Sequence, residues 1–170
     1  MRVKPDTSPR HTGIEGADAD RDFGTAASFY LDATRAPWRN HFRMETWVTG
    51  ELRELVSQQF NACADRVGVF GHSMGGHGAL VLALRNPGLY RSVSALAPIA
   101  SPTRCPWGTK AFAGYLGDAP QAWERRDVVT LIKGGARVSS RGRGQGGRTS
   151  PGLPAAVAPG SRAWRTGVVT

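Results

Sequence analysis

The stretch Gly71-His72-Ser73-Met74-Gly75-Gly76 predicts the fold of this chain. The apolar residues 67–70 precede it and indicate a strand, and the helix-compatible residues 78–84 follow it. A strand, a sharp glycine-flanked turn around a serine and a helix form the layout of a nucleophile elbow. The alternative is a glycine-rich strand–helix turn whose serine has no chemical role.

An elbow gives Ser73 the setting that a nucleophile needs. A serine on a strained turn holds its hydroxyl clear of the sheet, and Gly71 and Gly75 let the strand and helix backbones pass closely. The backbone N–H of Met74 then points at a developing oxyanion, close to the partial positive charge of the helix start. We therefore predict Ser73 as the nucleophile and Met74 as the backbone oxyanion donor.

The charge of the chain is unevenly distributed. Residues 1–133 hold 16 basic and all 13 acidic residues, which gives +3, and residues 134–170 hold six arginines and no acid, which gives +6. The basicity is therefore mostly a property of the last segment. That segment is rich in glycine, proline and arginine without helical or strand period, which predicts a disordered tail. It could bind RNA or be a solvated low-complexity end.

The compartment is also indicated by composition. No apolar run is long enough to span a bilayer, and residues 1–5 lack the apolar core of a signal peptide. The two cysteines, Cys63 and Cys105, form neither a disulfide framework nor a metal-ligand spacing. We expect two reduced thiols in a cytosolic protein, with no membrane association.

The clearest helix is predicted over residues 44–60. Its apolar side chains fall on one face at helical spacing, which we interpret as core packing. These side chains are Met44, Trp47, Val48, Leu52, Leu55, Val56 and Phe60.

A second strand and a loop follow the elbow helix. That helix should end near Arg85, because Asn86-Pro87-Gly88 is a stop signal. Residues 90–98 then indicate a buried strand, which completes a βαβ unit and predicts a parallel sheet. Residues 99–117 are expected to be a loop at the carboxyl end of this strand, where ligands bind in open α/β sheets. Residues 121–132 could form a helix.

Five blocks of the chain stand out: Asp6-Thr7-Ser8-Pro9-Arg10, Asp22-Phe23-Gly24-Thr25, Phe29-Tyr30-Leu31-Asp32-Ala33-Thr34, residues 71–79 and Cys105-Pro106-Trp107-Gly108. They resemble successive blocks of S-formylglutathione hydrolase, also called esterase D, in that family's order and spacing. The resemblance covers about residues 3–132. One departure is Arg21, where the family has tryptophan.

The resemblance implies a fold and an activity. It implies a partial α/β-hydrolase fold, with a parallel sheet and helices on both faces, over residues 1–133, and the elbow at 71–76. It implies a cytoplasmic serine thioesterase that releases formate from S-formylglutathione in formaldehyde catabolism, without a metal or other cofactor. Phe23, Gly24 and Trp107 match regions near the family's active-site mouth, and a homodimer is left open.

The resemblance also predicts what is missing. The family's first strands and its triad aspartate and histidine have no match here, since no acid or histidine follows Ile132. We therefore expect a chain truncated at both ends, in which the switch near Ile132 comes from translation in the wrong frame or from a mis-joined exon. We also expect the chain to be catalytically inert, because a serine triad that lacks one of its members loses most of its activity. The alternatives are a general carboxylesterase fragment and a non-catalytic protein whose 134–170 tail binds RNA.

Overall fold

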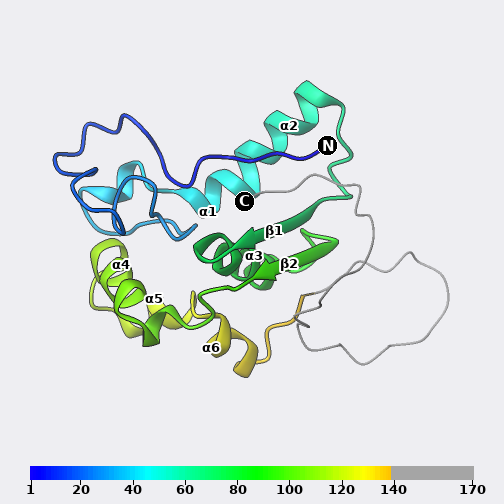
Figure 1. The fold of residues 1–170 in the computed structure, drawn as a ribbon. Helices are drawn as coiled ribbons and strands as arrows, with labels where there is room; N and C mark the ends of the chain where they lie inside the picture. The colour runs from blue at the N-terminus through cyan, green and yellow to red at the C-terminus, as the bar shows by residue number, and fades with distance from the viewer. Residues whose placement is uncertain (139–170) are drawn as a thin grey trace.

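The computed structural model describes residues 1–138 and contains a two-stranded parallel sheet (Figure 1). Strand β1 (Gly68–His72) pairs with strand β2 (Ser92–Leu96), and helix α3 (Met74–Arg85) connects them. Parallel strands run in the same direction, so the chain must cross back along the sheet before the second strand can begin. The predicted strand–elbow–helix–strand order, the helix end at Arg85 and the partial α/β fold are confirmed.

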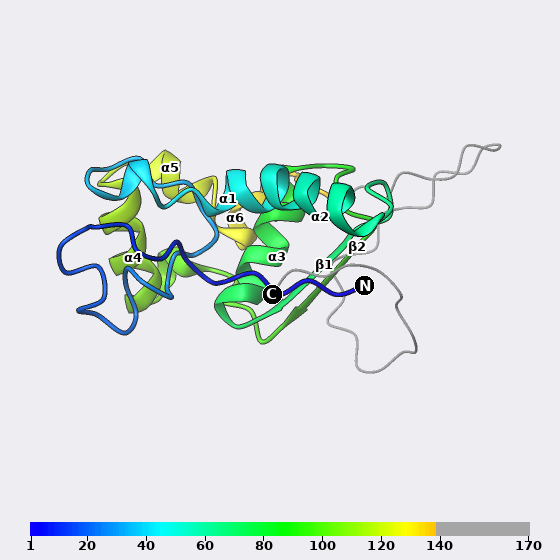
Figure 2. The same cartoon turned by 90° about the horizontal axis from the view of Figure 1, so that it is seen from above.

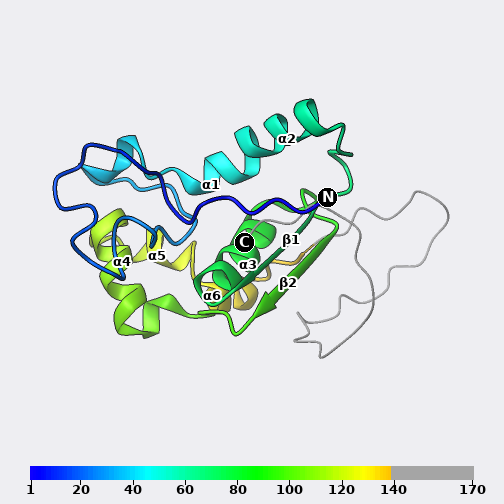
Figure 3. The ribbon, with the colours of Figure 1, turned by 45° about the horizontal axis from the view of Figure 1, so that its top comes forward.

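The other elements are short helices that precede and follow this unit in the chain. In chain order they are η1 (Trp38–Asn40), α1 (Met44–Thr46), the π-helical segment η2 (Trp47–Glu51), α2 (Leu52–Phe60), η3 (Pro102–Arg104), α4 (Pro106–Leu116), α5 (Pro120–Glu124) and α6 (Val128–Lys133). Residues 1–37 contain turns and isolated bridges. Figures 2 and 3 show that residues 10–40, α4 and α5 gather beyond the carboxyl ends of the strands.

Helix α3 covers one face of the sheet. Its Leu80, Val81 and Leu84 pack with Val128 of α6 and with Val93 and Ala95 of β2. Because side chains alternate along a strand, Phe70 and Leu96 point to the other face. On that face the guanidinium of Arg2 lies 5.7 Å from the centroid of the Phe70 ring.

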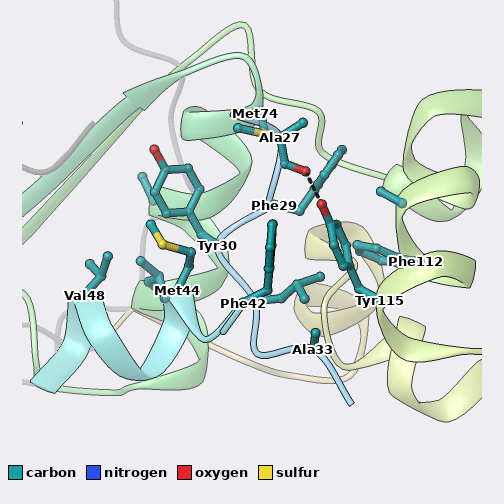
Figure 4. Close-up of a cluster of buried hydrophobic side chains, with 14 of the residues drawn as sticks. Ala27, Phe29, Tyr30, Ala33, Phe42, Met44, Val48, Met74, Phe112 and Tyr115 are labelled. Atoms are coloured by element: carbon teal, nitrogen blue, oxygen red, sulfur yellow. Dashed lines mark hydrogen bonds between the residues drawn. The ribbon is translucent and has the colours of Figure 1, made fainter. Parts of the chain in front are cut away.

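Tyr115 of α4 organises the larger core (Figure 4). Its hydroxyl accepts a hydrogen bond from the Gly24 N–H at 2.7 Å and donates one to the Ala27 carbonyl at 3.0 Å. Its ring stacks on Phe23 and Phe42, with centroids 4.5 and 5.5 Å apart. One residue therefore fixes the irregular segment 22–42 on α4.

The helix predicted over residues 44–60 is confirmed as a continuous helical run with a π-helical turn at its centre. Met44, Val48 and Leu52 of its apolar stripe are buried, and Trp47 and Val56 are partly buried against the core. Leu55 and Phe60 are 46% and 61% exposed, so the interpretation of the whole stripe as core was wrong. Periodicity defines an apolar face, and the residues that cover it come from elsewhere in the fold.

Three other local predictions needed correction. The strand over 90–98 forms, but Ser94 and Leu96 of β2 are exposed, so it is not buried. The loop over 99–117 contains η3 and α4, because Pro106 suits the first turn of a helix and the Cys105 Sγ accepts from the Gly108 N–H. The helix over 121–132 is divided into α5 and α6, since the Asp127 side chain caps a new helix by accepting from the Thr130 N–H.

The predicted tail over 134–170 lies almost entirely outside the described residues, which include only its first five. Helix α6 ends at Lys133, and the division of the chain at residue 133 stays a prediction. Within residues 1–138, no helix is long and apolar enough to cross a membrane.

Candidate active site

Ser73 lies at the carboxyl end of β1, directly before α3. Its backbone has φ 54° and ψ −117°, a conformation that L residues adopt rarely and that is found at functional turns. Three backbone hydrogen bonds hold this conformation: the Ser73 N–H donates to the Leu96 carbonyl at 3.0 Å, and the Ser73 carbonyl accepts from the N–H groups of His77 and Ile99. The turn is therefore fixed by β2 and by the segment after it.

The glycine before the serine allows this turn to close. A Cβ on Gly71 would collide with the carbonyl group of Gly75 and would lie 2.8 Å from the Gly76 nitrogen. Gly76 is itself close to the Leu96 carbonyl. The close approach of strand and helix that the sequence predicted is thus present in the fold.

Met74 occupies the first position of α3 and is buried. The first N–H groups of a helix have no partner inside the helix and carry its partial positive charge. An oxygen atom held beside Ser73 could therefore accept a hydrogen bond from the Met74 N–H.

Two histidines flank the serine, and they lie in different environments. His72 is exposed at the end of β1. His77 is fully buried in the first turns of α3, where its Nε2 donates to the Arg126 carbonyl at 2.8 Å, which fixes the tautomer. Burial lowers the pKa of His77 to about 4, so the ring is neutral at pH 7. Among residues 1–138, neither histidine makes a hydrogen bond to the Ser73 hydroxyl.

The late acid Asp127 is likewise engaged elsewhere. Its side chain is buried, accepts from the hydroxyls of Ser101 and Thr103 at 2.7 and 2.6 Å, and caps α6 through the Thr130 N–H. These hydrogen bonds lower its pKa, although burial acts in the opposite direction and is the largest single influence. Asp127 thus joins the segment after β2 to the start of α6.

Phe23, Gly24 and Trp107 come together at the junction of segment 22–29 with α4. Phe23 packs against Tyr115 and Trp38, and the Gly24 N–H donates to the Tyr115 hydroxyl. The Trp107 indole N–H donates to the Asp22 carbonyl. Their role as a substrate pocket stays a prediction, because each of these contacts is also ordinary packing.

The structure adds two residues that connect this junction to the elbow. Phe29, fully buried with φ 57°, lies between Trp107 and His77, with ring centroids 5.1 and 5.5 Å away. Tyr30, with φ 48°, packs its ring on Gly78, where a Cβ would lie 2.7 Å from Cγ. Their sequence signal was one of the family-like blocks, which gave no indication of left-handed backbone at either position.

The described residues hold no group of three or more histidine, cysteine, aspartate or glutamate side chains that could bind a metal ion. Cys63 and Cys105 are free thiols.

Comparison with known proteins gives consistent matches. A family model described as "Putative esterase" matches residues 1–143. S-formylglutathione hydrolases from Rattus norvegicus and Mus musculus are each 53% identical to this chain over 131 residues, which is 77% of this chain and 46% of each relative. A solved S-formylglutathione hydrolase from Agrobacterium tumefaciens superposes with a TM-score of 0.75 at 46% identity, over 78% of this chain and 48% of that one.

Strand β1, the Ser73 turn and α3 therefore form a partial α/β fold that matches an esterase-type hydrolase. The chain belongs to the esterase family whose model it matches, and the resemblance to S-formylglutathione hydrolases is confirmed. It spans about half the length of the curated relatives it matches.

Proposed function

We propose that this chain carries the nucleophile-bearing part of a serine thioesterase that hydrolyses S-formylglutathione. The observation that supports this most directly is the Ser73 turn, held by three backbone hydrogen bonds between β1 and α3. The similarity to S-formylglutathione hydrolases supports the choice of a thioester substrate.

In the proposed reaction, the Ser73 Oγ attacks the thioester carbonyl carbon and loses its proton to a general base. The Met74 N–H stabilises the oxyanion that forms on the carbonyl oxygen. The C–S bond then breaks, the glutathione sulfur takes up a proton, and a formyl ester of Ser73 remains. Water attacks this ester, which releases formate and restores the serine hydroxyl.

We further propose that this chain alone does not turn over. The support is that His77 is neutral, buried and bonded to Arg126, and that His72 makes no hydrogen bond to Ser73 among residues 1–138. Without a positioned base the serine hydroxyl is an ordinary alcohol, and triad enzymes lose several orders of magnitude in rate when one member is removed.

Other features follow from the resemblance alone. We propose a cytoplasmic site of action in formaldehyde catabolism, and we assign the mouth of the substrate site to Phe23, Gly24 and Trp107. We also propose a small-molecule thioester substrate, expect no nucleic-acid partner, and leave a homodimer open. The alternative of an RNA-binding tail concerns residues 134–170, nearly all outside the described residues.

A chimera tests the first proposal. Residues 1–133 replace the matching segment of the Agrobacterium tumefaciens enzyme, so that the relative supplies the rest of the hydrolase. We expect the chimera to hydrolyse S-formylglutathione, to lose this activity with Ser73→Ala, and to keep it with the matched control Ser94→Ala on the exposed side of β2. A folded chimera without Ser73-dependent activity would refute the assignment.

The 170-residue chain tests the second proposal. We expect its thioester hydrolysis to equal that of its own Ser73→Ala variant, and Ser73-dependent turnover would disprove inertness.

A general carboxylesterase is the second candidate, since the matching family model is no narrower than esterase. A chimera that prefers a nitrophenyl ester over S-formylglutathione would favour that candidate.

A further inference from the structure

The main-chain carbonyl of Ser73 is held by two N–H groups that come from different segments. The His77 N–H, in the first turn of α3, donates to it at 3.0 Å, and the Ile99 N–H, in the segment after β2, donates at 3.3 Å. A residue in a rarely populated conformation persists there only when the surrounding structure fixes it from several sides. The conformation of Ser73 therefore depends on what holds Ile99 in place relative to His77.

The side chain of His77 fixes the segment between α5 and α6. Its Nε2 donates to the Arg126 carbonyl at 2.8 Å, whereas its Nδ1 is buried and has no hydrogen-bond partner among residues 1–138. The rest of the ring packs against Phe29 and Phe112, with centroids 5.5 and 6.3 Å away. An apolar side chain of similar size could fill this space, so the N–H donor is the property that distinguishes histidine here.

The residue after Arg126 is bonded to the segment that follows β2. This residue, Asp127, accepts hydrogen bonds from the hydroxyls of Ser101 and Thr103 at 2.7 and 2.6 Å. Ser101 lies two residues after Ile99 in the chain. The two hydrogen bonds therefore restrict where the Ile99 N–H can lie.

These contacts close a ring that begins and ends at the Ser73 carbonyl. One arm passes through His77 to residue 126, and the other passes through Ile99 and Ser101 to residue 127. Every member of the ring is buried or half-buried. Because a hydrogen bond that is lost away from bulk water leaves a costly unpaired group, a break in one arm is expected to move the other.

We propose that His77 is a positioning residue for the Ser73 nucleophile. Its imidazole N–H holds residues 126–127, which through Ser101 set the Ile99 N–H against the Ser73 carbonyl. The imidazole takes no part in proton transfer, since its one N–H is bonded to a main-chain carbonyl. The proposal rests on the proposed function, because it takes Ser73 as the nucleophile.

Amide hydrogen exchange in the full 170-residue chain tests the ring directly. His77→Met removes the donor and keeps a similar side-chain size, whereas His77→Gln keeps an N–H donor at about the same reach. We expect the Ile99 N–H to exchange about tenfold faster in His77→Met, and within about twofold of the unsubstituted chain in His77→Gln.

The control amide is the Ala33 N–H, which donates to the Phe42 carbonyl at 2.8 Å in the segment held by Tyr115. Its exchange should be the same in both variants. Equal acceleration at Ala33 and Ile99 would show a general loss of stability and would overturn the proposal. Unchanged exchange at Ile99 in His77→Met, or equally fast exchange in His77→Gln, would overturn it as well.

A break at another point of the ring gives an independent test, which decides the matter if His77→Met does not fold. Thr103→Val removes a hydroxyl from Asp127 and keeps the side-chain size. Thr109→Val is the matched control, since the Thr109 hydroxyl donates to the Pro106 carbonyl within α4, outside the ring. Ile99 exchange should be severalfold faster in Thr103→Val than in Thr109→Val, and equal rates would refute the ring.

Kinetics in the chimera described above connect the ring to catalysis. His77→Met should lower kcat for S-formylglutathione about tenfold and leave KM within about twofold, because the nucleophile is displaced while substrate binding is unchanged. His77→Gln should restore kcat. A loss confined to KM, or equal kcat in the two variants, would overturn the positioning role. A chimera without Ser73-dependent activity would refute the proposed function, and the exchange rates would then decide whether His77 positions the turn.

Discussion

Gly71→Ala should destabilise the whole unit around Ser73, because no flexible group can move to accept the added methyl. The new Cβ would meet the Gly75 carbonyl group and the Gly76 nitrogen, which are all main-chain atoms of α3. These atoms can move only if α3 shifts away from β1, and such overpacking costs about 1–3 kcal/mol of unfolding free energy. For a domain of this size that corresponds to a fall in Tm of about 3–10 °C.

Gly50→Ala is the matched control. Gly50 lies in the π-helical turn η2, is exposed, and has no atom within 4 Å of an added Cβ. Alanine is favoured over glycine in helices by about 0.8–1 kcal/mol, so this substitution should leave the stability unchanged or raise it. The same chemical change therefore has opposite effects at the two positions.

The measurement is urea denaturation of both variants and of the unsubstituted chain, followed by far-UV circular dichroism. We expect a lower midpoint for Gly71→Ala with the same slope, which reports lost stability without a change in the surface exposed on unfolding. If Gly71→Ala is as stable as Gly50→Ala, the close approach of β1 and α3 does not exist, and the elbow geometry is refuted.

Three further predictions concern the core. Burial lowers the pKa of His77 from 6.5 to about 4. Between these pH values the unfolded chain binds a proton that the folded chain does not. The contribution of His77 to the free energy of unfolding is therefore complete above pH 6.5, and it falls toward pH 4 by up to about 1.4 kcal/mol per pH unit. The urea midpoint should depend less on pH in His77→Gln than in the unsubstituted chain. The control His41→Gln, at an exposed position, should follow the unsubstituted chain. The same pH dependence of the midpoint in all three proteins would contradict the burial of a neutral ring. Tyr115→Phe should lower the free energy of unfolding by about 1–2 kcal/mol in urea denaturation, because Gly24 and Ala27 each lose a hydrogen-bond partner. Tyr90→Phe should leave it unchanged, since the Tyr90 hydroxyl has no partner among the described residues. Equal losses in the two variants would argue against the Tyr115 hydrogen bonds. Glu45→Gln should lower the free energy of unfolding by about 1–3 kcal/mol, since it leaves the mostly buried Arg85 and Arg126 without their carboxylate. Asp6→Asn removes the carboxylate of the exposed pair with Arg10 and should lower it by less than about 1 kcal/mol. A larger loss for Asp6→Asn than for Glu45→Gln in thermal melts would refute the buried network.

The local structure that follows from short-range sequence was largely predictable. The elbow, the helix over 44–60 and the stop after Arg85 depend on periodicity and on glycine and proline signals, which act within one turn or strand. Helix α4 was missed because the proline, glycine and tryptophan of residues 105–108 were taken as loop signals. In the fold, Pro106 starts the helix, and Ala111, Phe112 and Tyr115 form its buried side.

In the candidate site, the place of Ser73 between a strand and a helix was predictable from the sequence, and its surroundings were not. The order of residues 71–76 locates a serine between a strand and a helix. Which histidine could serve it depends on how α3 meets the segment after α5, and that contact buries His77 against Arg126. No spacing in the sequence indicates a hydrogen bond between residues 49 positions apart.

The sequence by itself determined the family, the parallel strand–elbow–helix unit and the position of Ser73, because these depend on residues that are neighbours in the chain. Only the tertiary structure decided that Leu55 and Phe60 are exposed, that Tyr115 holds segment 22–42, and that Glu45 pairs with Arg85 and Arg126. Burial and charge pairing are properties of contacts between distant segments. They are set by which surfaces the folded chain brings together, and a linear pattern cannot specify them.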